Sequence, residues 1–573
     1  MNEGHAGFAA LERVSDLMRS ERLSFEDAAL AVRSSTAFTT HTPVPAGHDR
    51  FHESLIRRYL ADTEGWIGLG WGEFMALGQD PGGGDQFNMT YLACNLAGYV
   101  NGVSRKHGEV SRGLLSSFWP SLLEHEVPVG HVTNGVHLPT WTRPGLQELL
   151  GASETGVVGS DFTRSASSLP AEPLWRERQA AKAELLEHCR GLLTRCFQQR
   201  QESPKVLARM LEGLREDALV IGFARRFAPY KRATLLFQDP DRLARILSQE
   251  DRPVCFLFSG KAHPADGGGQ DLLKHIANIA RDERFIGKVI FLEDYDIGLA
   301  RKLKQGVDVW LNNPVRPLEA SGTSGMKVAA NGGLNLSILD GWWIEGCDGR
   351  NGWAVGNEDK TYPNQELQNQ LDNESLLALL EDEVIPLYFD RGPDGIPHAW
   401  LERVRHALAT LPECFDTNRM VGQYSGEAYA PLARAHRSLV ANDHQSLEHE
   451  AAHRMALLSA YDSIRVRAVR APDLGAVRSG DTLSVEADVE LAGLDPSAVE
   501  VEFIYGHAGE HERALYGGIL QPMAPTGAGP EGASTFRTTV TVQASGSYRF
   551  GVRVRPSRRG PWDADLTGRT LWA

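Results

Sequence analysis

Cysteine is scarce in this 573-residue sequence, and no two cysteines are spaced for a shared role. The six cysteines are scattered with no C-x-x-C pair, so the sequence indicates neither a disulfide framework nor a zinc site. Long apolar runs are also lacking, since none reaches the roughly 18 residues that a membrane span requires. The first residues form an acidic, amphipathic segment, unlike a basic and apolar signal peptide. These absences predict a cytoplasmic protein with no membrane partner and no metal.

Positive charge is in deficit along the chain. There are 59 Lys and Arg residues against 74 Asp and Glu residues, which gives a formal net charge of −15. This balance argues against nucleic acid or an anionic membrane as the main partner. An anionic ligand would therefore have to be met by a local basic cluster. The length of the chain predicts more than one domain.

Hydrophobic patterning divides the chain into regions of different character. Residues 1–150 mix helical periodicity with two extended segments, 37–47 and 127–141. Residues 174–216 are rich in Ala, Leu, Glu and Arg, which predicts long helices. Apolar, β-branched runs separated by helical stretches then follow, at 218–224, 254–260, 288–294, 307–313 and 334–341. This alternation predicts a parallel, doubly wound α/β sheet, with further helices from about 366 to about 460.

The C-terminal region has a different periodicity. Residues 463–573 alternate apolar and polar side chains with period two, between turns rich in Gly, Pro and Asp. This pattern predicts a small antiparallel β-sandwich.

A basic cluster follows the first strand of the doubly wound region. The segment ARRFAPYKR contributes Arg225, Arg226, Lys231 and Arg232 after the carboxyl end of that strand, where ligands bind in open α/β sheets. Such a cluster suits an anion clamp, because arginine binds phosphate through two hydrogen bonds and lysine acts as a point charge. A solvated basic helix start explains the spacing equally well, so both interpretations stand.

A turn rich in glycine and hydroxyl groups, EASGTSGMK, leads to a lone lysine. Its Glu319 precedes a short helical segment whose first backbone amides, near Thr323 and Ser324, would be free to hold a phosphate. Lys327 would lie about one turn inside this helix. A desolvated lysine beside other cations has a lowered pKa, which suits Schiff-base formation. The alternative is an exposed helical lysine. Tyr295, after another strand, is either a ligand-contacting ring or an ordinary core tyrosine.

Eight motifs follow one another along the chain: NEGH, FTTHTPVPAGHDRF, NGVSRKHGEVSR, HVTNGVHLPTW, ARRFAPYKR, SGKAHP, VIFLEDYDIGLA and EASGTSGMKVAANGGLNLSILDGWWIEG. With these motifs the sequence resembles the α-glucan (glycogen, starch and maltodextrin) phosphorylase family, particularly its shorter bacterial and archaeal branch. The resemblance covers nearly the whole chain, and EASGTSGMK together with RRFAPYKR is highly specific.

The resemblance implies a GT-B architecture of two Rossmann-like domains, with pyridoxal 5′-phosphate bound covalently to Lys327. The preceding loop would cradle the cofactor phosphate, with Thr323 and Ser324 as donors and Arg225 in support. Tyr295 matches a cofactor-site tyrosine. In this family the cofactor acts through its phosphate, as a proton relay to the substrate phosphate.

The resemblance also implies roles in the substrate site. Arg226 and Lys231 would hold the substrate phosphate and, with Lys327, form the catalytic group. The sugar would be bound by Glu319, Ser321, Gly322, Asn134, His41, Glu3 and His5. The implied reaction is reversible: a terminal α-1,4-linked glucose of glycogen, starch or maltodextrin reacts with phosphate to give glucose 1-phosphate with retention. Phosphate would stabilise an oxocarbenium-like state electrostatically. The resemblance leaves open whether the protein forms a homo-oligomer.

The resemblance predicts four parts in the chain. These are 1–173 as the C-terminal part of the N-terminal GT-B domain, 174–216 as a helical connector, 217–460 as the pyridoxal-phosphate-binding Rossmann-like domain with trailing helices, and 461–573 as the β-sandwich. Family members have a few hundred residues before the NEGH motif, including a glycine-rich loop over the phosphates. Residues 1–150 contain no such loop. We therefore expect the first domain to be incomplete, and residues 1–573 alone to be inactive in phosphorolysis.

Two other functions are compatible with the residues. A nucleotide-sugar glycosyltransferase of the same architecture, such as a glycogen synthase, also uses an Arg/Lys pair and a late glutamate loop. It has no reason, however, to keep the S-G-T-S-G-M-K turn. A catalytically inactive glucan-binding fragment would retain the binding motifs.

Overall fold

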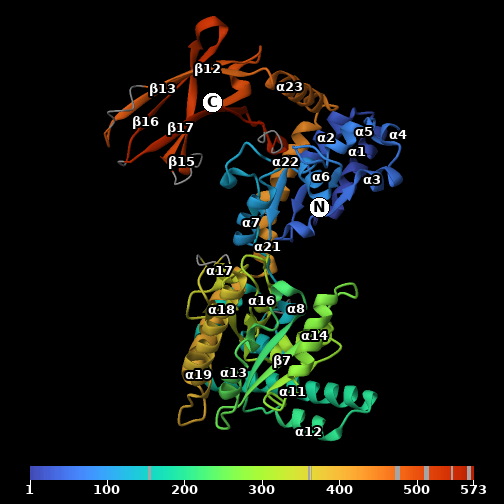
Figure 1. Cartoon of the computed structure of the whole chain (residues 1–573), viewed down its shortest axis with the longest axis vertical. Helices are drawn as coiled ribbons and strands as arrows, with labels where there is room; N and C mark the ends of the chain where they lie inside the picture. Colours follow the sequence, from blue (N-terminus) through green and yellow to red (C-terminus); the bar gives the residue numbers. More distant parts are fainter. Residues whose placement is uncertain are drawn as a thin grey trace. The chain divides into compact units, whose positions relative to one another are not determined.

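The computed structural model describes residues 1–152, 156–358, 362, 364–471, 478–508, 515–543, 546–563 and 569–573. The chain forms two compact units. The first contains residues 1–101, 111–130 and 425–573, and the second contains residues 102–110 and 131–424. In Figure 1 the second unit carries the green and yellow segments, whereas the first combines the blue and the red ends of the chain. No helix among the described residues has the length and apolar character needed to span a membrane.

The second unit is built on a six-stranded parallel sheet. Its strands are β6 (Leu219–Arg226), β7 (Val254–Lys261), β8 (Val289–Leu292), β9 (Val309–Asn312), β10 (Leu334–Ile338) and β11 (Gly352–Val355). Their order is β11-β10-β9-β6-β7-β8, and every pair is parallel. The five predicted strands are confirmed, and β11 was missed. The chain runs outward from β6 to β8 and returns on the other side of β6 as β9. This makes the β6–β9 boundary the topological switch point, where such sheets bind ligands.

Helices cover the sheet of the second unit on both faces. They are α8 (Leu138–Trp141), α9 (Pro144–Leu149), α10 (Gly159–Ser165), α11 (Ala171–Arg200), α12 (Pro204–Glu212), α13 (Pro240–Leu247), α14 (Gly267–Ile279), α15 (Ile297–Gly306), α16 (Thr323–Ala329), α17 (Trp343–Gly346), α18 (Gln365–Leu379), α19 (Ile385–Phe389), α20 (His398–Cys414) and α21 (Thr417–Tyr424). The long helices predicted for 174–216 are confirmed as α11 and α12.

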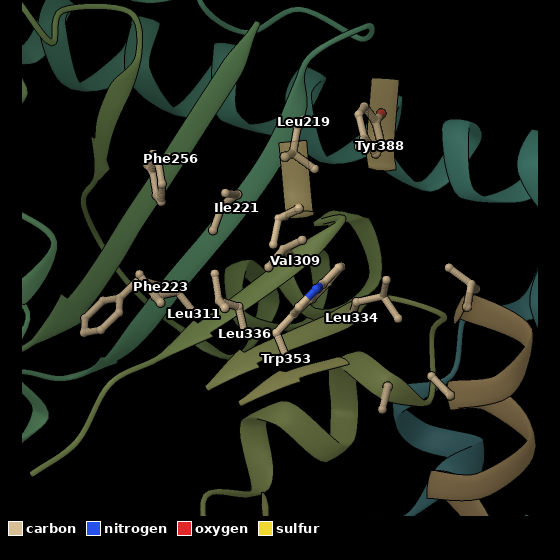
Figure 2. Packing of buried hydrophobic residues seen from close by; sticks show 14 of the residues in the cluster. Leu219, Ile221, Phe223, Phe256, Val309, Leu311, Leu334, Leu336, Trp353 and Tyr388 are labelled. Carbon is tan, nitrogen blue, oxygen red and sulfur yellow. The ribbon is translucent and has the colours of Figure 1, made fainter. Parts of the chain in front are cut away.

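Alternate residues of the strands β6 to β9 enter two separate cores. Figure 2 shows one core, in which Ile221 and Phe223 of β6 lie beside Val309 and Leu311 of β9. Trp310, between the last two, belongs to the opposite core, with the α11 side chains. Burial on both faces explains the continuous apolar runs in the sequence.

A buried ion pair joins α11 to the sheet. Lys182 of α11 is 0% exposed, and its Nζ lies 2.7 Å from Asp308 Oδ2. The same Nζ donates to the Ala218 carbonyl (2.9 Å) and to the Tyr388 hydroxyl. Asp308 Oδ2 also accepts from the Val220 amide at 2.9 Å. This network holds the first residues of β6, the residue before β9 and the helix α11 together.

The first unit ends in a seven-stranded antiparallel sheet. Its strands are β12 (Arg465–Arg470), β13 (Thr482–Glu490), β14 (Val499–Ala508), β15 (Leu515–Ala528), β16 (Ser534–Thr541), β17 (Tyr548–Pro556) and β18 (Leu571–Trp572), in the order β12-β13-β16-β15-β14-β17-β18. The long strand β15 pairs with β14 through its first half and with β16 through its second. Apolar side chains from β13, β14, β16 and β17 form one core. The predicted antiparallel strands are confirmed.

The rest of the first unit is mainly helical. Its helices are α1 (Gly7–Glu21), α2 (Phe25–Ser34), α3 (Glu53–Tyr59), α4 (Thr63–Ile67), α5 (Trp71–Ala76), α6 (Met89–Asn95), α22 (Ala430–Leu439) and α23 (Gln445–Tyr461); α7 (Arg105–Leu115) runs from the second unit into the first.

Two extended segments were predicted within residues 1–150, but five short strands occur there: β1 (Ala37–Thr39), β2 (Arg50–His52), β3 (Gln86–Asn88), β4 (Tyr99–Gly102) and β5 (Gly130–His131). The prediction for 127–141 is wrong at its end, which forms α8.

Candidate active site

A cluster of opposite charges lies at the switch point of the second unit. Arg225 is the last residue but one of β6, and Lys231 lies in the turn that follows this strand. Both cations reach one carboxylate: Glu319 Oε2 is 2.5 Å from Lys231 Nζ and 3.2 Å from Arg225 Nη1. A second Arg225 nitrogen donates to Asn312 at the end of β9. The three charged side chains are only 8–13% exposed, so water screens them weakly.

Burial and mutual charge shift the pKa values of this cluster. Burial, with the charge of Arg225, lowers the pKa of Lys231 to about 8, although Glu319 opposes the shift. Burial also raises the pKa of Glu319, but the charges of Arg225 and Lys231 outweigh it. The pKa of Glu319 therefore lies below its ordinary value. Lys231 can lose its proton in mildly alkaline solution while Glu319 stays ionised.

Arg232 lies outside this cluster. Its guanidinium donates to the carbonyls of Asn313 (2.9 Å) and Pro314 (2.7 Å), and pairs with Asp372 at 2.8 Å. Through these contacts Arg232 stabilises the loop that follows β9. Of the four cations predicted as an anion clamp, the structure brings Arg225 and Lys231 together, on Glu319.

The segment that carries Glu319 rests on the residues after β10. The Glu319 amide donates to Asp340 Oδ2 at 2.8 Å, and the Trp342 amide donates to the Ser321 carbonyl at 2.9 Å. Gly341 has φ 55°, and a Cβ there would come within 2.5 Å of the Ser321 carbonyl oxygen. Only glycine fits this close approach to the Ser321 carbonyl without strain. Burial, with the charge of Glu319, raises the pKa of the neighbouring Asp340 to about 7.

The helix start after this segment presents open backbone groups. Gly322, with φ 91°, precedes Thr323, the first residue of α16, and no side chain caps the helix. Thr323 and Ser324 are half-buried. Ser321 Oγ is buried and has no hydrogen-bond partner among the described residues. The free donors suit an anionic group, because helix N-termini favour negative charge.

Lys327 lies in the last turn of α16. Its side chain is half-buried, and its Nζ lies 4.2 Å from the ring centroid of Trp141 on α8. Burial lowers the pKa of Lys327. The alternative of an exposed helical lysine therefore does not fit. Trp141 was missed as a site residue, although it ends the motif HVTNGVHLPTW.

Three buried donors of the second unit lack an acceptor among the described residues. Arg225 Nε, Ser321 Oγ and Lys304 Nζ are buried without an acceptor in the described part of the chain. Buried donors in native proteins are nearly always satisfied, so this excess indicates an anionic ligand. No group of three or more potential metal-binding side chains occurs among the described residues.

Three other predicted site residues of the second unit make no hydrogen bond, among the described contacts, to the charged cluster of Arg225, Lys231 and Glu319. Arg226 is exposed and lies beside Tyr230, to which it hydrogen-bonds. Tyr295 follows β8 and is half-buried, and burial raises its pKa although the charge of Arg225 opposes this. The Asn134 amide donates to the Val103 carbonyl at 3.0 Å, and its side chain is half-buried.

Three predicted sugar-binding residues, Glu3, His5 and His41, belong to the first unit. Glu3 accepts from the His41 amide at 2.5 Å and from the Thr42 hydroxyl at 2.7 Å. Its φ is 66°, an uncommon conformation for a side-chain-bearing residue that often occurs at functional sites. His5 is exposed in the turn that follows. The structure thus brings Glu3 and His41 together within this unit.

Fold and site together define an α/β protein with a parallel sheet whose switch point holds the buried charged cluster of Arg225, Lys231 and Glu319. Residues 75–358 match the model of the carbohydrate phosphorylase family, and residues 461–566 match that of the glycogen phosphorylase C-terminal domain. The chain is 39% identical to glycogen phosphorylase of Mycobacterium tuberculosis (strain H37Rv), over 97% of this chain and 65% of the relative. It is also 39% identical to maltodextrin phosphorylase of Thermococcus litoralis, over 88% of this chain and 58% of the relative.

A third relative, glycogen phosphorylase of Aquifex aeolicus, is 38% identical over 76% of this chain and 62% of its own length. The chain thus spans slightly less than two thirds of the length of these relatives. It belongs to the α-glucan phosphorylase family.

Proposed function

We propose that the protein is an α-glucan phosphorylase that carries pyridoxal 5′-phosphate on Lys327. The reaction is the reversible transfer of a terminal α-1,4-linked glucose to phosphate, giving glucose 1-phosphate with retention. The observation that carries this proposal is the position of Lys327: half-buried, with a lowered pKa, behind the uncapped start of α16. A surface lysine would need none of these features, whereas an amine that forms a covalent bond to an aldehyde needs a low pKa.

The residues that would hold the cofactor surround this lysine. Thr323, Ser324 and the backbone amides at the start of α16 bind its phosphate, with Arg225 in support. Tyr295, whose pKa is affected by the charge of Arg225, is proposed as a further cofactor contact. When bound, the cofactor supplies a phosphate group that relays a proton to the substrate phosphate. The chain's own contribution is to hold two phosphate groups close together, which requires the surplus of cations and free donors described above.

Arg226 and Lys231 bind the substrate phosphate. In the structure Lys231 is paired with Glu319, so an incoming phosphate has to compete with this carboxylate for the ammonium group. We infer that phosphate draws Lys231 away and leaves Glu319 free to accept a sugar hydroxyl. Ser321, Gly322 and Asn134 complete the sugar contacts in the second unit, and Glu3, His5 and His41 provide those of the first.

We further propose that the chain follows the GT-B plan, with a cytoplasmic location and a C-terminal β-sandwich. The six-stranded parallel sheet is consistent with the second Rossmann-like domain, and the scattered cysteines support a reducing compartment. The boundaries 1–173, 174–216, 217–460 and 461–573 remain proposals.

The lowered pKa of Lys231 predicts that the phosphate clamp weakens in alkali. Lys231 is charged below pH about 8 and neutral above it, so kcat/KM for phosphate should fall as the pH rises through about 8. In Lys231→Arg the guanidinium stays charged, and this fall should move to higher pH. The measurement is the pH profile of kcat/KM for both proteins, whose ratio cancels the titration of phosphate itself. Identical profiles would show that Lys231 does not contact phosphate.

Donor choice tests the proposed function against its alternatives. The purified protein is incubated with a maltodextrin primer and one of two glucosyl donors, glucose 1-phosphate or a nucleotide-activated glucose. We expect elongation and phosphate release with glucose 1-phosphate alone. Elongation from the nucleotide sugar would identify a glycosyltransferase, and glucan binding without turnover would identify an inactive binding protein. Either result would refute the proposal.

A further inference from the structure

A second lysine of the site, Lys304, is more deeply buried than Lys327 and has no assigned role. It lies on α15 and is 2% exposed. Its Nζ sits 3.6 Å from the ring centroid of Trp310 on β9, and no acceptor for it occurs among the described residues. The indole nitrogen of Trp310 is also buried without a partner in the described structure. The helix α15 packs against α16, which carries Lys327.

The surroundings of Lys304 are unfavourable for a cation in the absence of a ligand. Fully buried lysines are almost always paired. The charged groups whose fields reach Lys304 are Lys327 of α16 and Arg225 of β6, both cations, and no carboxylate is among them in the described structure. Burial, followed by these two charges, holds the pKa of Lys304 well below its ordinary value. The Trp310 ring offsets part of this cost, because a cation is attracted to an aromatic face.

Lys302, two residues before Lys304 on α15, shows the ordinary alternative. It reaches the surface of the same helix and pairs with Glu184 at 3.1 Å. A lysine on α15 can therefore be solvated and paired, whereas Lys304 points its amine into the core beside two further cations. Lys304 Nζ and Arg225 Nε are buried donors without acceptors in the described structure, and the charges of Arg225 and Lys327 both act on Lys304. This arrangement is consistent with a site completed by an anion.

We propose that Lys304 is a further cofactor-binding residue, whose ammonium group pairs with an anionic oxygen of the pyridoxal phosphate on Lys327. This inference rests on the proposed function. If Lys304 pairs with the cofactor, binding of the cofactor is linked to protonation of the Lys304 amine. In the empty pocket the surrounding cations favour the neutral amine of Lys304, and a bound anion favours the ammonium form. Cofactor binding should therefore be accompanied by proton uptake at Lys304.

The test measures binding of pyridoxal phosphate to the 573-residue chain, freed of cofactor, by titration calorimetry in two buffers of different ionisation enthalpy. We expect Lys304→Met to weaken binding about 10- to 100-fold, as loss of one charge-assisted hydrogen bond implies. The variant should also take up a smaller fraction of a proton than the wild type. Contributions from Lys327 and Lys231 are common to both proteins and cancel in the difference. The cofactor-free variant should melt at a higher temperature, because it no longer buries an amine that lacks a hydrogen-bond partner among the described residues.

Two further variants keep the test decisive. Lys302→Met, on the exposed part of the same helix, should match the wild type in affinity and proton uptake. Lys304→Gln, which keeps a donor without the charge, should fall between the wild type and Lys304→Met. Unchanged affinity and proton uptake in Lys304→Met, with only the melting temperature altered, would reduce Lys304 to a packing role and overturn the inference. No cofactor uptake even by the wild type would instead refute the proposed function on which it rests.

Discussion

Replacement of Lys327 by alanine is expected to abolish covalent binding of pyridoxal phosphate, and to reduce phosphorolysis to background in any form of the protein that is active. The substitution removes the amine that forms the bond, while the helix around it is preserved because alanine has the highest helix propensity. The absorbance band of the bound cofactor should disappear, and the intact mass should lack the cofactor increment. Glucan affinity should change little, since the lysine contacts the cofactor and not the sugar.

The matched control for this substitution is Lys302→Ala. Lys302 is half-exposed and pairs with Glu184 at the surface, so its loss should cost no more than about 1 kcal/mol and leave the cofactor in place. A Lys327→Ala protein that still carries covalent cofactor, or retains turnover, would show that another amine forms the bond.

The largest effect on stability is expected for Asp308→Ala. Asp308 is 2% exposed, and its removal leaves the ammonium of Lys182 buried without its carboxylate partner. It also leaves the Val220 amide without its acceptor. Breaking a buried pair from one side costs about 3–5 kcal/mol, because an uncompensated charge remains in the core. The free energy of unfolding, measured by urea denaturation, should fall by this amount.

The control removes both charges at once. Lys182→Met with Asp308→Leu replaces the pair by apolar side chains, and such replacements are often neutral or stabilising. The double variant should therefore be more stable than Asp308→Ala. Equal losses in the single and the double variant would mean that packing around the strands, and not the unpaired charge, determines the cost.

The fold was predictable from sequence where strands are buried on both faces. The run at 218–224 is continuously apolar, and so is the run at 254–260, because helices cover both sides of that sheet. The strand β11 was missed because its four residues, GWAV, include glycine and alanine and form no run of β-branched side chains. The strands β2 and β3 were missed because three residues carry too little periodicity to be read.

The candidate site was predictable only where its residues stand in one motif. Arg225 and Lys231 were predicted together because both follow one strand in the motif ARRFAPYKR. Glu319 was assigned to the sugar through the family resemblance, and its pairing with both cations was not predicted. The support from Asp340 and Gly341 depends on contacts between segments about twenty residues apart. Lys304 was missed because a lysine in an amphipathic helix is normally expected at the surface. Burial of that lysine arises from the packing of α15 on the sheet, which no local pattern encodes.

The central claim, that Lys327 carries the cofactor, is tested most directly by reduction and peptide mapping. The chain is incubated with pyridoxal phosphate, reduced with borohydride and digested, and its peptides are identified by mass spectrometry. The account predicts one stoichiometric adduct, on the peptide that contains Lys327. An adduct on Lys231, Lys261 or Lys304 in its place, or no adduct at all, would contradict it.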